Sequence, residues 1–229
     1  MKVIAKIKSD FPGKFGIPRQ SGLIEDLTAT VVFEEEFRVD EALRGIEDFS
    51  HLWLIWEFSE NKRDTWSPTV RPPRLGGNKR VGVFATRSSF RPNSIGLSSV
   101  KLSGVEKTKE YGTVLHVSGA DLMDGTPIYD IKPYLAFTDS HPEAKGGFAE
   151  EKLSYSLKVD VPEEVEKLIP EEKRNAVIKI LESDPRPSYI EDEKRIYAFE
   201  YAGMHLEFKV SDDTLTLLSV NNINTKKED

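Results

Sequence analysis

Residues 80–102 read RVGVFATRSSFRPNSIGLSSVKL and set the pattern for most of the chain. They contain two short strand candidates, Arg80–Ala85 and Ile95–Leu102, separated by a turn rich in serine, arginine and proline. Similar segments recur along the first 140 residues with almost no helical periodicity: Val3–Lys8, Thr28–Phe33, His51–Phe58, Thr113–Ser118 and Pro127–Phe137, the last broken by Pro133. Repeated short strands with Gly/Pro turns predict a mainly β domain, a closed or nearly closed β-barrel.

The pattern changes after Phe137. Apolar residues at helical spacing predict a helix over Pro162–Leu181, and Pro170 is expected to split it. The remaining signals predict a hairpin around Ala202-Gly203 and a last strand: Arg195–Tyr201, Met204–Val210 and Thr214–Val220. We therefore expect three parts: a β-barrel domain at residues 1–140, a polar linker at residues 141–160 and a small α+β C-terminal domain at residues 161–229.

The positive charge of this acidic chain is concentrated in one block. The 229 residues carry a formal net charge of −7, yet residues 61–101 contain nine Lys and Arg against one acid, a local balance of +8. Residues 71–96 alone have six cations, no acid, three prolines and four glycines. A basic segment on an acidic protein is typical of a surface that meets an anion.

Several classes of function are excluded by what the sequence lacks. The absence of cysteine excludes a disulfide scaffold, a Cys-ligated zinc and a thiol nucleophile, and it fits a reducing cytosol. The four histidines are dispersed without metal-ligand spacing, so we expect no metal. No Rossmann or Walker A motif occurs. There is neither a signal-peptide core nor an apolar run of the roughly 20 residues that a membrane helix requires. We expect a cytoplasmic protein with no membrane partner.

Two loops combine arginine with other hydrogen-bonding side chains. Arg19 and Gln20 follow Pro18 at the end of a Gly/Pro loop, and Arg87 and Arg91 lie in the turn FATRSSFRPN. Arginine binds carboxylates and phosphates through paired N–H groups. Either loop can also be an ordinary solvated turn, but the density of cations without acids favours a binding role for the second.

Carboxylates and one histidine are further candidates for chemistry. Residues 120–128, ADLMDGTPI, place Asp121 and Asp124 on a turn, and Asp130 and Tyr134 follow. Asp-Gly-Thr-Pro is a common turn signal, so these acids can be structural. They can instead accept hydrogen bonds from ribose hydroxyls or an amino group. His51 begins the most apolar strand, where a histidine is more often structural than a general base.

Two aromatic residues and one rigid turn complete the candidates. Trp53 and Trp56, in the apolar segment HLWLIWEF, are expected in the core rather than as stacking platforms for bases. The turn DPRPSY, residues 184–189, carries Arg186 and Tyr189, with prolines on both sides of the arginine. This turn can simply end the preceding helix, or it can present the two side chains to a site.

Six segments in the same order resemble the TsaA/TrmO family: PRQSGL, FSHLW, RPPRLGG, VGVFATRSSFRPNSIGL, DLMDGTPIYDIKPY and DPRPSY. Members of that family are tRNA adenine-N6-methyltransferases that use S-adenosylmethionine. The resemblance, from about Ile4 to Tyr189, implies an unusual β-barrel methyltransferase fold, a homodimer and a small C-terminal domain. It also implies that the substrate is the anticodon loop of tRNA, where a threonylcarbamoyl-adenosine beside the anticodon receives a methyl group on N6.

The resemblance also implies site residues. The family's cofactor-binding positions correspond to Pro18, Arg19, Gln20, Ser59, Glu60, Arg87, Leu97, Asp121, Leu122, Met123 and Asp124. The candidate general bases for the N6 proton are Asp121, Asp124, Asp130, His51 and Tyr134, and the sequence does not choose among them. The side chains expected to meet RNA are Arg71, Arg74, Lys79, Arg80 and Arg91, with Arg186 and Tyr189 completing the site or stacking on a base.

Three other functions remain open at this point. A methyltransferase that acts on a small metabolite would keep the cofactor residues, but it would not need the basic block. A non-catalytic RNA-binding sensor of S-adenosylmethionine would bind the cofactor without turnover. A plain phosphate-binding barrel would be supported by the arginine loops alone.

Overall fold

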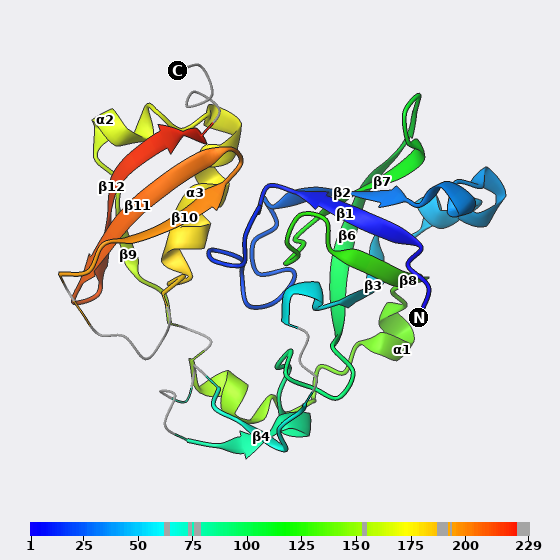
Figure 1. The fold of residues 1–229 in the computed structure, drawn as a ribbon, viewed down its shortest axis with the longest axis horizontal. Coiled ribbons are helices and arrows are strands. Elements are labelled where there is room, and N and C mark those ends of the chain that lie inside the picture. The colour runs from blue at the N-terminus through cyan, green and yellow to red at the C-terminus, as the bar shows by residue number, and fades with distance from the viewer. Residues whose placement is uncertain are drawn as a thin grey trace.

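The computed structural model describes residues 1–61, 65–72, 75, 79–152, 155–186, 192 and 194–223. Arg74 and Tyr189, both expected at the RNA face, lie outside the described residues. Figure 1 shows two main bodies, a barrel and a smaller sheet backed by helices. A separate two-stranded sheet, β4 (Thr69–Val70) with β5 (Val81–Gly82), forms a short arm, and its β4 is labelled below the barrel in the figure. No helix in the described part of the chain is long and apolar enough to cross a membrane.

The N-terminal body confirms the predicted closed β-barrel. Six antiparallel strands close on themselves in the order β1-β2-β7-β6-β3-β8. Their bounds are β1 Ala5–Ser9, β2 Thr28–Phe33, β3 His51–Glu57, β6 Ile95–Thr108, β7 Gly112–Ser118 and β8 Pro127–Pro133. Closure gives each strand a neighbour on both sides, although β1 and β8 pair over only two residues.

Alternation along β3 explains how the barrel interior is filled. Leu52 and Leu54 are fully buried and Trp56 is 7% exposed, whereas the residues between them are half-buried on the outer face. β3 pairs with β6 on one side and β8 on the other. Because successive side chains of a strand point to opposite faces, every second residue enters the core. Trp56, at the end of this inward row, also reaches the barrel mouth.

Two predicted strands are shorter in the structure. In Arg80–Ala85 only Val81–Gly82 (β5) is strand, paired with Thr69–Val70 (β4), and a 3-10 turn follows at Val83–Ala85. The Val83 carbonyl accepts from the backbone N–H and the hydroxyl of Thr86 and from the guanidinium of Arg91, so it closes a turn instead of pairing with another strand. The predicted strand Pro127–Phe137 ends at Pro133, which has no N–H to continue the pairing, and helix α1 follows at Ala136–Asp139.

Short 3-10 turns occupy most of the remaining connections in the described part of the chain. Three lie between β2 and β3, one follows β3, and one precedes the second body: Glu35–Phe37, Asp40–Leu43, Ile46–Asp48, Ser59–Asn61 and Gly147–Lys152. The turn after β3 matters most here, because it carries residues expected to bind the cofactor.

The second body is a four-stranded sheet in the order β10-β11-β12-β9 with two helices. Its elements are β9 Lys158–Asp160, α2 Glu163–Glu166, α3 Glu171–Glu182, β10 Tyr197–Tyr201, β11 Met204–Ser211 and β12 Thr214–Asn222. Pro170 separates α2 from α3, as predicted, because it cannot donate inside a helix. β9 lies within the expected linker at residues 141–160, and it pairs in parallel with β12.

Candidate functional site

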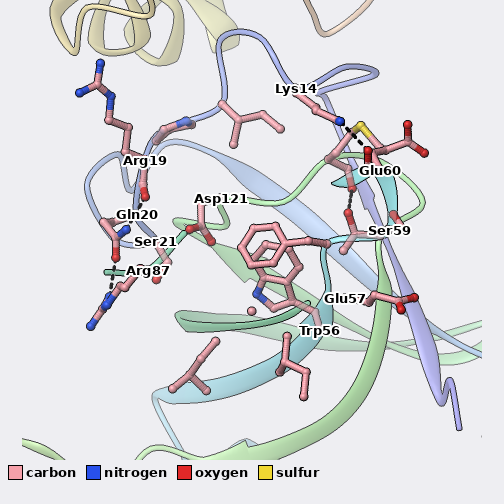
Figure 2. A pocket seen from close by; sticks show the side chains of 18 of the residues that line it. Lys14, Arg19, Gln20, Ser21, Trp56, Glu57, Ser59, Glu60, Arg87 and Asp121 are labelled. Carbon is pink, nitrogen blue, oxygen red and sulfur yellow. Dashed lines mark hydrogen bonds between the residues drawn. The ribbon is translucent and has the colours of Figure 1, made fainter. Parts of the chain in front are cut away.

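A pocket of about 690 Å³ opens at one end of the barrel (Figure 2). Its walls come from the loop at residues 14–21, the end of β3 with the 3-10 turn behind it, the loop at residues 86–91, the start of β6 and residues 121–126. The volume lies within the range of about 300–1,000 Å³ that small-molecule sites have. Because its walls come from five separated segments, closure of the barrel creates this site.

An aromatic wall forms one side of the pocket. The rings of Trp56 and Phe58 lie 4.3 Å apart between centroids, and both residues line the cavity. Gly96, opposite Trp56 across the β3–β6 pair, leaves room for the indole: a Cβ at this position would lie 2.3 Å from Trp56 Cε2. Trp56 is therefore part of the core, as predicted, and part of the pocket wall.

Trp53 lies on the outer face of β3 and also lines the pocket. Its indole nitrogen donates to the Asp139 carboxylate over 2.8 Å, and its ring centroid is 5.4 Å from that of Tyr134. Trp53 is half-buried rather than a core residue, so the prediction for this tryptophan was wrong. An outward-facing residue of a barrel strand contacts other elements, here α1, instead of the interior.

A hydrogen-bonded chain connects the barrel core to the carboxylate of Asp121. The indole N–H of Trp56 donates to Ser98 Oγ over 2.9 Å, and Ser98 Oγ donates to Asp121 Oδ1 over 2.6 Å. Burial raises the pKa of Asp121, and the Ser98 hydroxyl, nearby backbone N–H groups and Arg87 lower it by a smaller amount. Asp121 is therefore a carboxyl group with an elevated pKa at the edge of a cavity, a feature that is frequent at functional sites.

Cationic and amide side chains line the pocket together with this carboxylate. Arg87 donates through Nη1 to Gln20 Oε1, and the Gln20 amide in turn donates to the carbonyl of Arg19 over 2.5 Å. Lys14 Nζ donates to the carbonyl of Glu60 over 2.9 Å (Figure 2). Together these contacts join the loop at residues 14–21 to the two segments on either side of the pocket.

Arg91 holds the neighbouring loop in place. Its guanidinium donates to the carbonyls of Val83 over 3.2 Å and Thr86 over 2.6 Å, and it lies 5.5 Å from the ring centroid of Phe84. Arg91 also lines the pocket. Two of its donors are thus used within the loop, which places this arginine in the pocket wall rather than on an open phosphate-binding surface.

Most of the expected cofactor-binding residues meet in this pocket. Of the eleven expected residues, nine line the pocket: Pro18, Arg19, Gln20, Ser59, Glu60, Arg87, Leu97, Asp121 and Met123. Leu122 and Asp124 do not line it. Leu122 is buried in the barrel core, and the exposed Asp124 accepts a hydrogen bond from the Ser9 backbone N–H over 3.0 Å. The turn at residues 121–124 therefore sends alternate side chains to the pocket and away from it.

Among the candidate bases, Asp121 lines the pocket and the other four do not. Asp130 forms an ion pair with Lys132 over 2.9 Å on β8. His51 lies with one ring nitrogen 2.9 Å from Ser50 Oγ, and its ring is 6.2 Å from that of Tyr134. Asp124 is held by the turn described above. The geometry brings only Asp121 to the cavity.

The described basic residues expected at RNA lie in three places: Arg91 is in the pocket wall, three others are at the arm, and Arg186 is in the second body. Arg71, Lys79 and Arg80 are exposed on or beside the β4–β5 arm, where Arg80 Nε donates to Thr69 Oγ1 over 2.8 Å. Trp66 and Phe84, close to these residues in the chain, have exposed rings whose centroids lie 5.9 Å apart.

Arg186 lies in the second body at the end of α3. It is paired there with Asp184 through two hydrogen bonds of 2.8 and 3.0 Å. The Asp184 carboxylate also accepts from the Tyr155 hydroxyl over 2.8 Å. Arg186 is thus part of a local network, whereas its expected partner Tyr189 lies outside the described residues.

Several pocket residues were not predicted from the sequence. They are Lys14, Ile17, Ser21, Trp53, Trp56, Glu57, Phe58, Thr86, Ile95, Gly96, Ser99 and Thr126. Six of them lie inside the segments that carry the family resemblance: Ser21, Trp53, Thr86, Ile95, Gly96 and Thr126. For Trp56 the signal was the apolar segment HLWLIWEF, whose inward row of side chains ends at the barrel mouth. Glu57 adds a carboxylate to the pocket lining. Burial of Tyr129 and its hydrogen bond with Glu57 raise the pKa of the Tyr129 hydroxyl to about 12. In the described part of the chain, no group of three or more His, Asp or Glu residues could hold a metal ion.

Comparison with known proteins agrees with this architecture. Residues 6–140 match the family model of the tRNA-methyltransferase O N-terminal domain, and residues 154–223 match that of the TrmO C-terminal domain. The chain is 41% identical over 217 residues to the tRNA (adenine(37)-N6)-methyltransferase of Escherichia coli (strain K12), covering 91% of this chain and 92% of that protein.

Two further relatives extend the comparison. The enzyme of the same name from Eikenella corrodens is 42% identical over 163 residues, which cover 71% of this chain and 91% of that protein. A crystal structure of TrmO from Pseudomonas aeruginosa superposes with a TM-score of 0.78 at 31% identity, covering 97% of each chain. On its barrel, its second domain and these matches, the chain belongs to the tRNA-methyltransferase O family.

Proposed function

We propose that this protein transfers a methyl group from S-adenosylmethionine to N6 of a threonylcarbamoyl-adenosine at position 37 of tRNA, next to the anticodon. The coarser activity follows from its family: the chain is a tRNA (adenine-N6)-methyltransferase. The observation that carries the proposed cofactor and reaction is the pocket at the barrel mouth, which a carboxylate of raised pKa lines together with arginine and amide side chains. The threonylcarbamoyl group is proposed from the family resemblance and is the part that the experiment below tests.

The donor set of the pocket fits S-adenosylmethionine. That molecule carries a carboxylate, an ammonium group, ribose hydroxyls, a sulfonium and an adenine ring. Arg19 and Arg87 suit the carboxylate, and Asp121 and Glu60 suit the ammonium group and the hydroxyls. The aromatic wall suits a ring that stacks. When bound, S-adenosylmethionine supplies an electrophilic methyl group.

The remaining chemistry falls to residues of this chain. The N6 atom of adenine is a poor nucleophile because its lone pair is delocalised, so an acceptor for its proton helps the reaction. Asp121 is the candidate base at the cavity, and its raised pKa brings it closer to the range in which a carboxylate exchanges protons efficiently. Alignment of N6 with the methyl group is the larger contribution, and the pocket walls provide it.

The RNA is proposed to meet the arm beside the pocket. Arg71, Lys79 and Arg80 place positive charge there, next in the chain to the exposed rings of Trp66 and Phe84. Unpaired bases of an anticodon loop stack on aromatic side chains, and their phosphates attract Lys and Arg. We also propose that the protein is a cytoplasmic homodimer with two domains, the barrel at residues 1–140 and a C-terminal domain that includes β9 in addition to residues 161–229.

The decisive experiment measures methyl transfer from labelled S-adenosylmethionine to total tRNA. A second sample comes from cells that cannot make threonylcarbamoyl-adenosine. Label in the first sample only is the expected result. Label in both would refute the proposed nucleotide, because the carbamoyl group would not be required.

Label in neither sample, with cofactor binding intact, would favour a protein that binds the cofactor without methylating RNA. One relative favours testing that alternative directly. A protein of Pyrococcus abyssi described as a probable S-adenosyl-L-methionine-binding protein is 37% identical over 150 residues.

A further inference from the structure

The loop at residues 10–27 belongs to both bodies of the molecule at once. It leaves the barrel after β1, and its residues 17–21 line the candidate pocket. Phe11, Ile24 and Leu27, at its two ends, are buried in the hydrophobic core of the second body rather than in that of the barrel. We call this segment the cofactor loop.

Helix α3 of the second body holds both ends of the cofactor loop through ion pairs. Lys173 Nζ lies 2.5 Å from the carboxylate of Asp10, and Lys179 Nζ lies 2.5 Å from that of Asp26. Asn175 adds a hydrogen bond of 2.8 Å to Asp26. The three partners lie on one helix, spaced so that they reach the beginning and the end of the same loop.

The middle of the cofactor loop is fitted closely to the second sheet. Gly16 has φ of +91°, and a Cβ built on it would lie 2.5 Å from Cδ2 of Phe199 on β10. The ring of Phe11 lies 5.0 Å from that of Tyr201, and the Ala202 backbone N–H donates to the carbonyl of Asp10 over 2.8 Å. The loop therefore contacts the second body along its length, not only at its ends.

On its other side the cofactor loop holds the segment that carries Asp121. Gly22 N–H donates to the carbonyl of Gly119 over 2.9 Å, and Asp124 N–H donates to that of Phe11 over 2.8 Å. The backbone N–H of Ser21 interacts with the Asp121 carboxylate and lowers its pKa. A shift of the loop would therefore move pocket residues on both the loop and the neighbouring segment.

We propose that the C-terminal domain positions the cofactor loop, and that Lys173 and Lys179 of α3 thereby determine the affinity for S-adenosylmethionine. This inference rests on the proposed function, since it takes the pocket as the cofactor site. Lys173 and Lys179 do not line the pocket and act through the loop. A loop already held in its binding conformation loses less conformational entropy when the ligand binds, which strengthens binding.

The test replaces lysine by glutamate in the full chain, in Lys179→Glu and in Lys173→Glu/Lys179→Glu. Each glutamate faces the aspartate that its lysine paired with. S-Adenosylhomocysteine is the probe, and calorimetry without RNA gives its affinity. We expect the double variant to bind about tenfold more weakly, because two part-buried pairs become repulsive. The matched control is Lys158→Glu, which removes an ion pair of 3.1 Å to Asp213 at the far side of the same domain and should not change the affinity.

Rescue separates positioning from general damage. Asp26→Lys combined with Lys179→Glu exchanges the two charges and should restore most of the affinity lost in Lys179→Glu. Titrations are run well below the unfolding temperature of each variant, so a loss of folded protein does not imitate weak binding. If Lys173→Glu/Lys179→Glu fails to fold, Asp26→Asn replaces it, with a smaller expected loss, because it keeps the acceptor for Asn175.

The outcomes are distinct. Unchanged affinity in the variants, with normal binding by the unmodified protein, would overturn the inference. An effect confined to the KM for tRNA would also overturn it, because the C-terminal domain would then act on the RNA. If the unmodified protein itself does not bind S-adenosylhomocysteine, the assignment of the pocket fails, and the positioning inference falls with it.

Discussion

Ser98 donates its hydroxyl hydrogen bond to Asp121 over 2.6 Å, and this contact connects a core strand to the candidate site. Ser98 is 1% exposed in the middle of an apolar barrel. A buried hydroxyl is stabilised only if it is hydrogen-bonded, and here it both accepts from Trp56 and donates to Asp121. One side chain thus fixes the orientation of an aromatic wall and of a carboxylate.

The first prediction concerns Ser98→Ala. The Trp56 N–H loses its acceptor and the Asp121 carboxylate loses a donor, so we expect a loss of about 1–3 kcal/mol in unfolding free energy. The pKa of Asp121 should rise further, because the hydroxyl lowers it. The acidic limb of the pH–rate profile should therefore move to higher pH. Ser103→Ala is the control, since that serine lies on the same strand and pairs with Ser118 at the surface. If the acidic limb does not move in Ser98→Ala, the ionisation of Asp121 does not control the rate of methyl transfer.

The second prediction is that Asp121→Asn stabilises the protein while it weakens the cofactor site. Burial raises the folded-state pKa of Asp121 above its ordinary value of 3.8. Ionisation of this carboxyl group therefore lowers the free energy of unfolding as the pH rises from 3.8 through the folded-state pKa. The variant should therefore gain in melting temperature relative to the unmodified protein over that window, and the gain should stay constant above it. Affinity for S-adenosylhomocysteine should fall at least about tenfold through loss of a charged acceptor. A lower melting temperature at neutral pH would contradict this account of Asp121.

The barrel could be predicted because its strands are local patterns. β3 stands out in the sequence as a nearly continuous apolar segment, HLWLIWEF, and Gly/Pro-containing loops separate the strand candidates. Two boundaries could not be predicted. The turn that ends β5 is held at the Val83 carbonyl by Thr86 and also by Arg91, eight residues away, and β9 pairs with the distant strand β12. The contacts of Arg91 and β12 lie outside any local window of sequence.

The candidate site, like the fold, could be predicted from the sequence only in part. Arg19, Arg87 and Asp121 lie in motifs and were named from the sequence, and the pocket brings them together. Trp56 and Phe58 were not assigned to it, because an apolar strand in the sequence does not indicate which of its ends reaches the mouth of a barrel. Asp124 lies three residues from Asp121, yet its side chain caps the backbone of Ser9 instead. Asp121 and Asp124 are thus close in the sequence, but only the side chain of Asp121 reaches the pocket.

The third prediction compares two glycines of β6. Gly96→Ala would place a methyl group 2.3 Å from Trp56 Cε2, so the indole must move, at a cost of roughly 1–3 kcal/mol in stability. Cofactor affinity should fall as well, since Trp56 lines the pocket. Gly104→Ala, on the same strand, meets no atom within 4 Å and should change neither quantity appreciably. Equal effects of the two substitutions would mean that strand flexibility, and not the contact with Trp56, matters.

The fourth prediction concerns the salt dependence of tRNA binding. Each phosphate contact that is removed should flatten the slope of log K against log salt by roughly 0.7–0.9. Arg71→Ala/Lys79→Ala, which removes two exposed cations at the arm, should thus reduce the slope by up to twice that amount and leave cofactor affinity unchanged. The control for net charge is Lys109→Ala/Lys209→Ala, which removes two exposed cations outside the arm, one between β6 and β7 and one on β11. If both double variants changed the slope equally, the arm would not be the RNA face.

The fifth prediction concerns Arg186→Ala and acid stability. Burial raises the pKa of Asp184, but hydrogen bonds from Arg186 and Tyr155 outweigh it and leave the pKa below 3.8. This carboxylate therefore contributes stability above pH 3.8 that is lost as the pH falls through its folded-state value. Removing Arg186 leaves a buried carboxylate without its cation, which should cost up to about 3 kcal/mol at neutral pH.

Thermal unfolding between pH 3 and pH 7 measures this effect, and the gap between Arg186→Ala and the unmodified protein should narrow toward the acid end. Tyr155→Phe keeps the ion pair but removes one hydrogen bond to Asp184, so its loss should be smaller. A gap that does not depend on pH would show that Arg186 stabilises the turn through packing. A variant with unchanged stability and impaired methyl transfer would instead place Arg186 at the RNA, because the loss could not then come from unfolding of the domain.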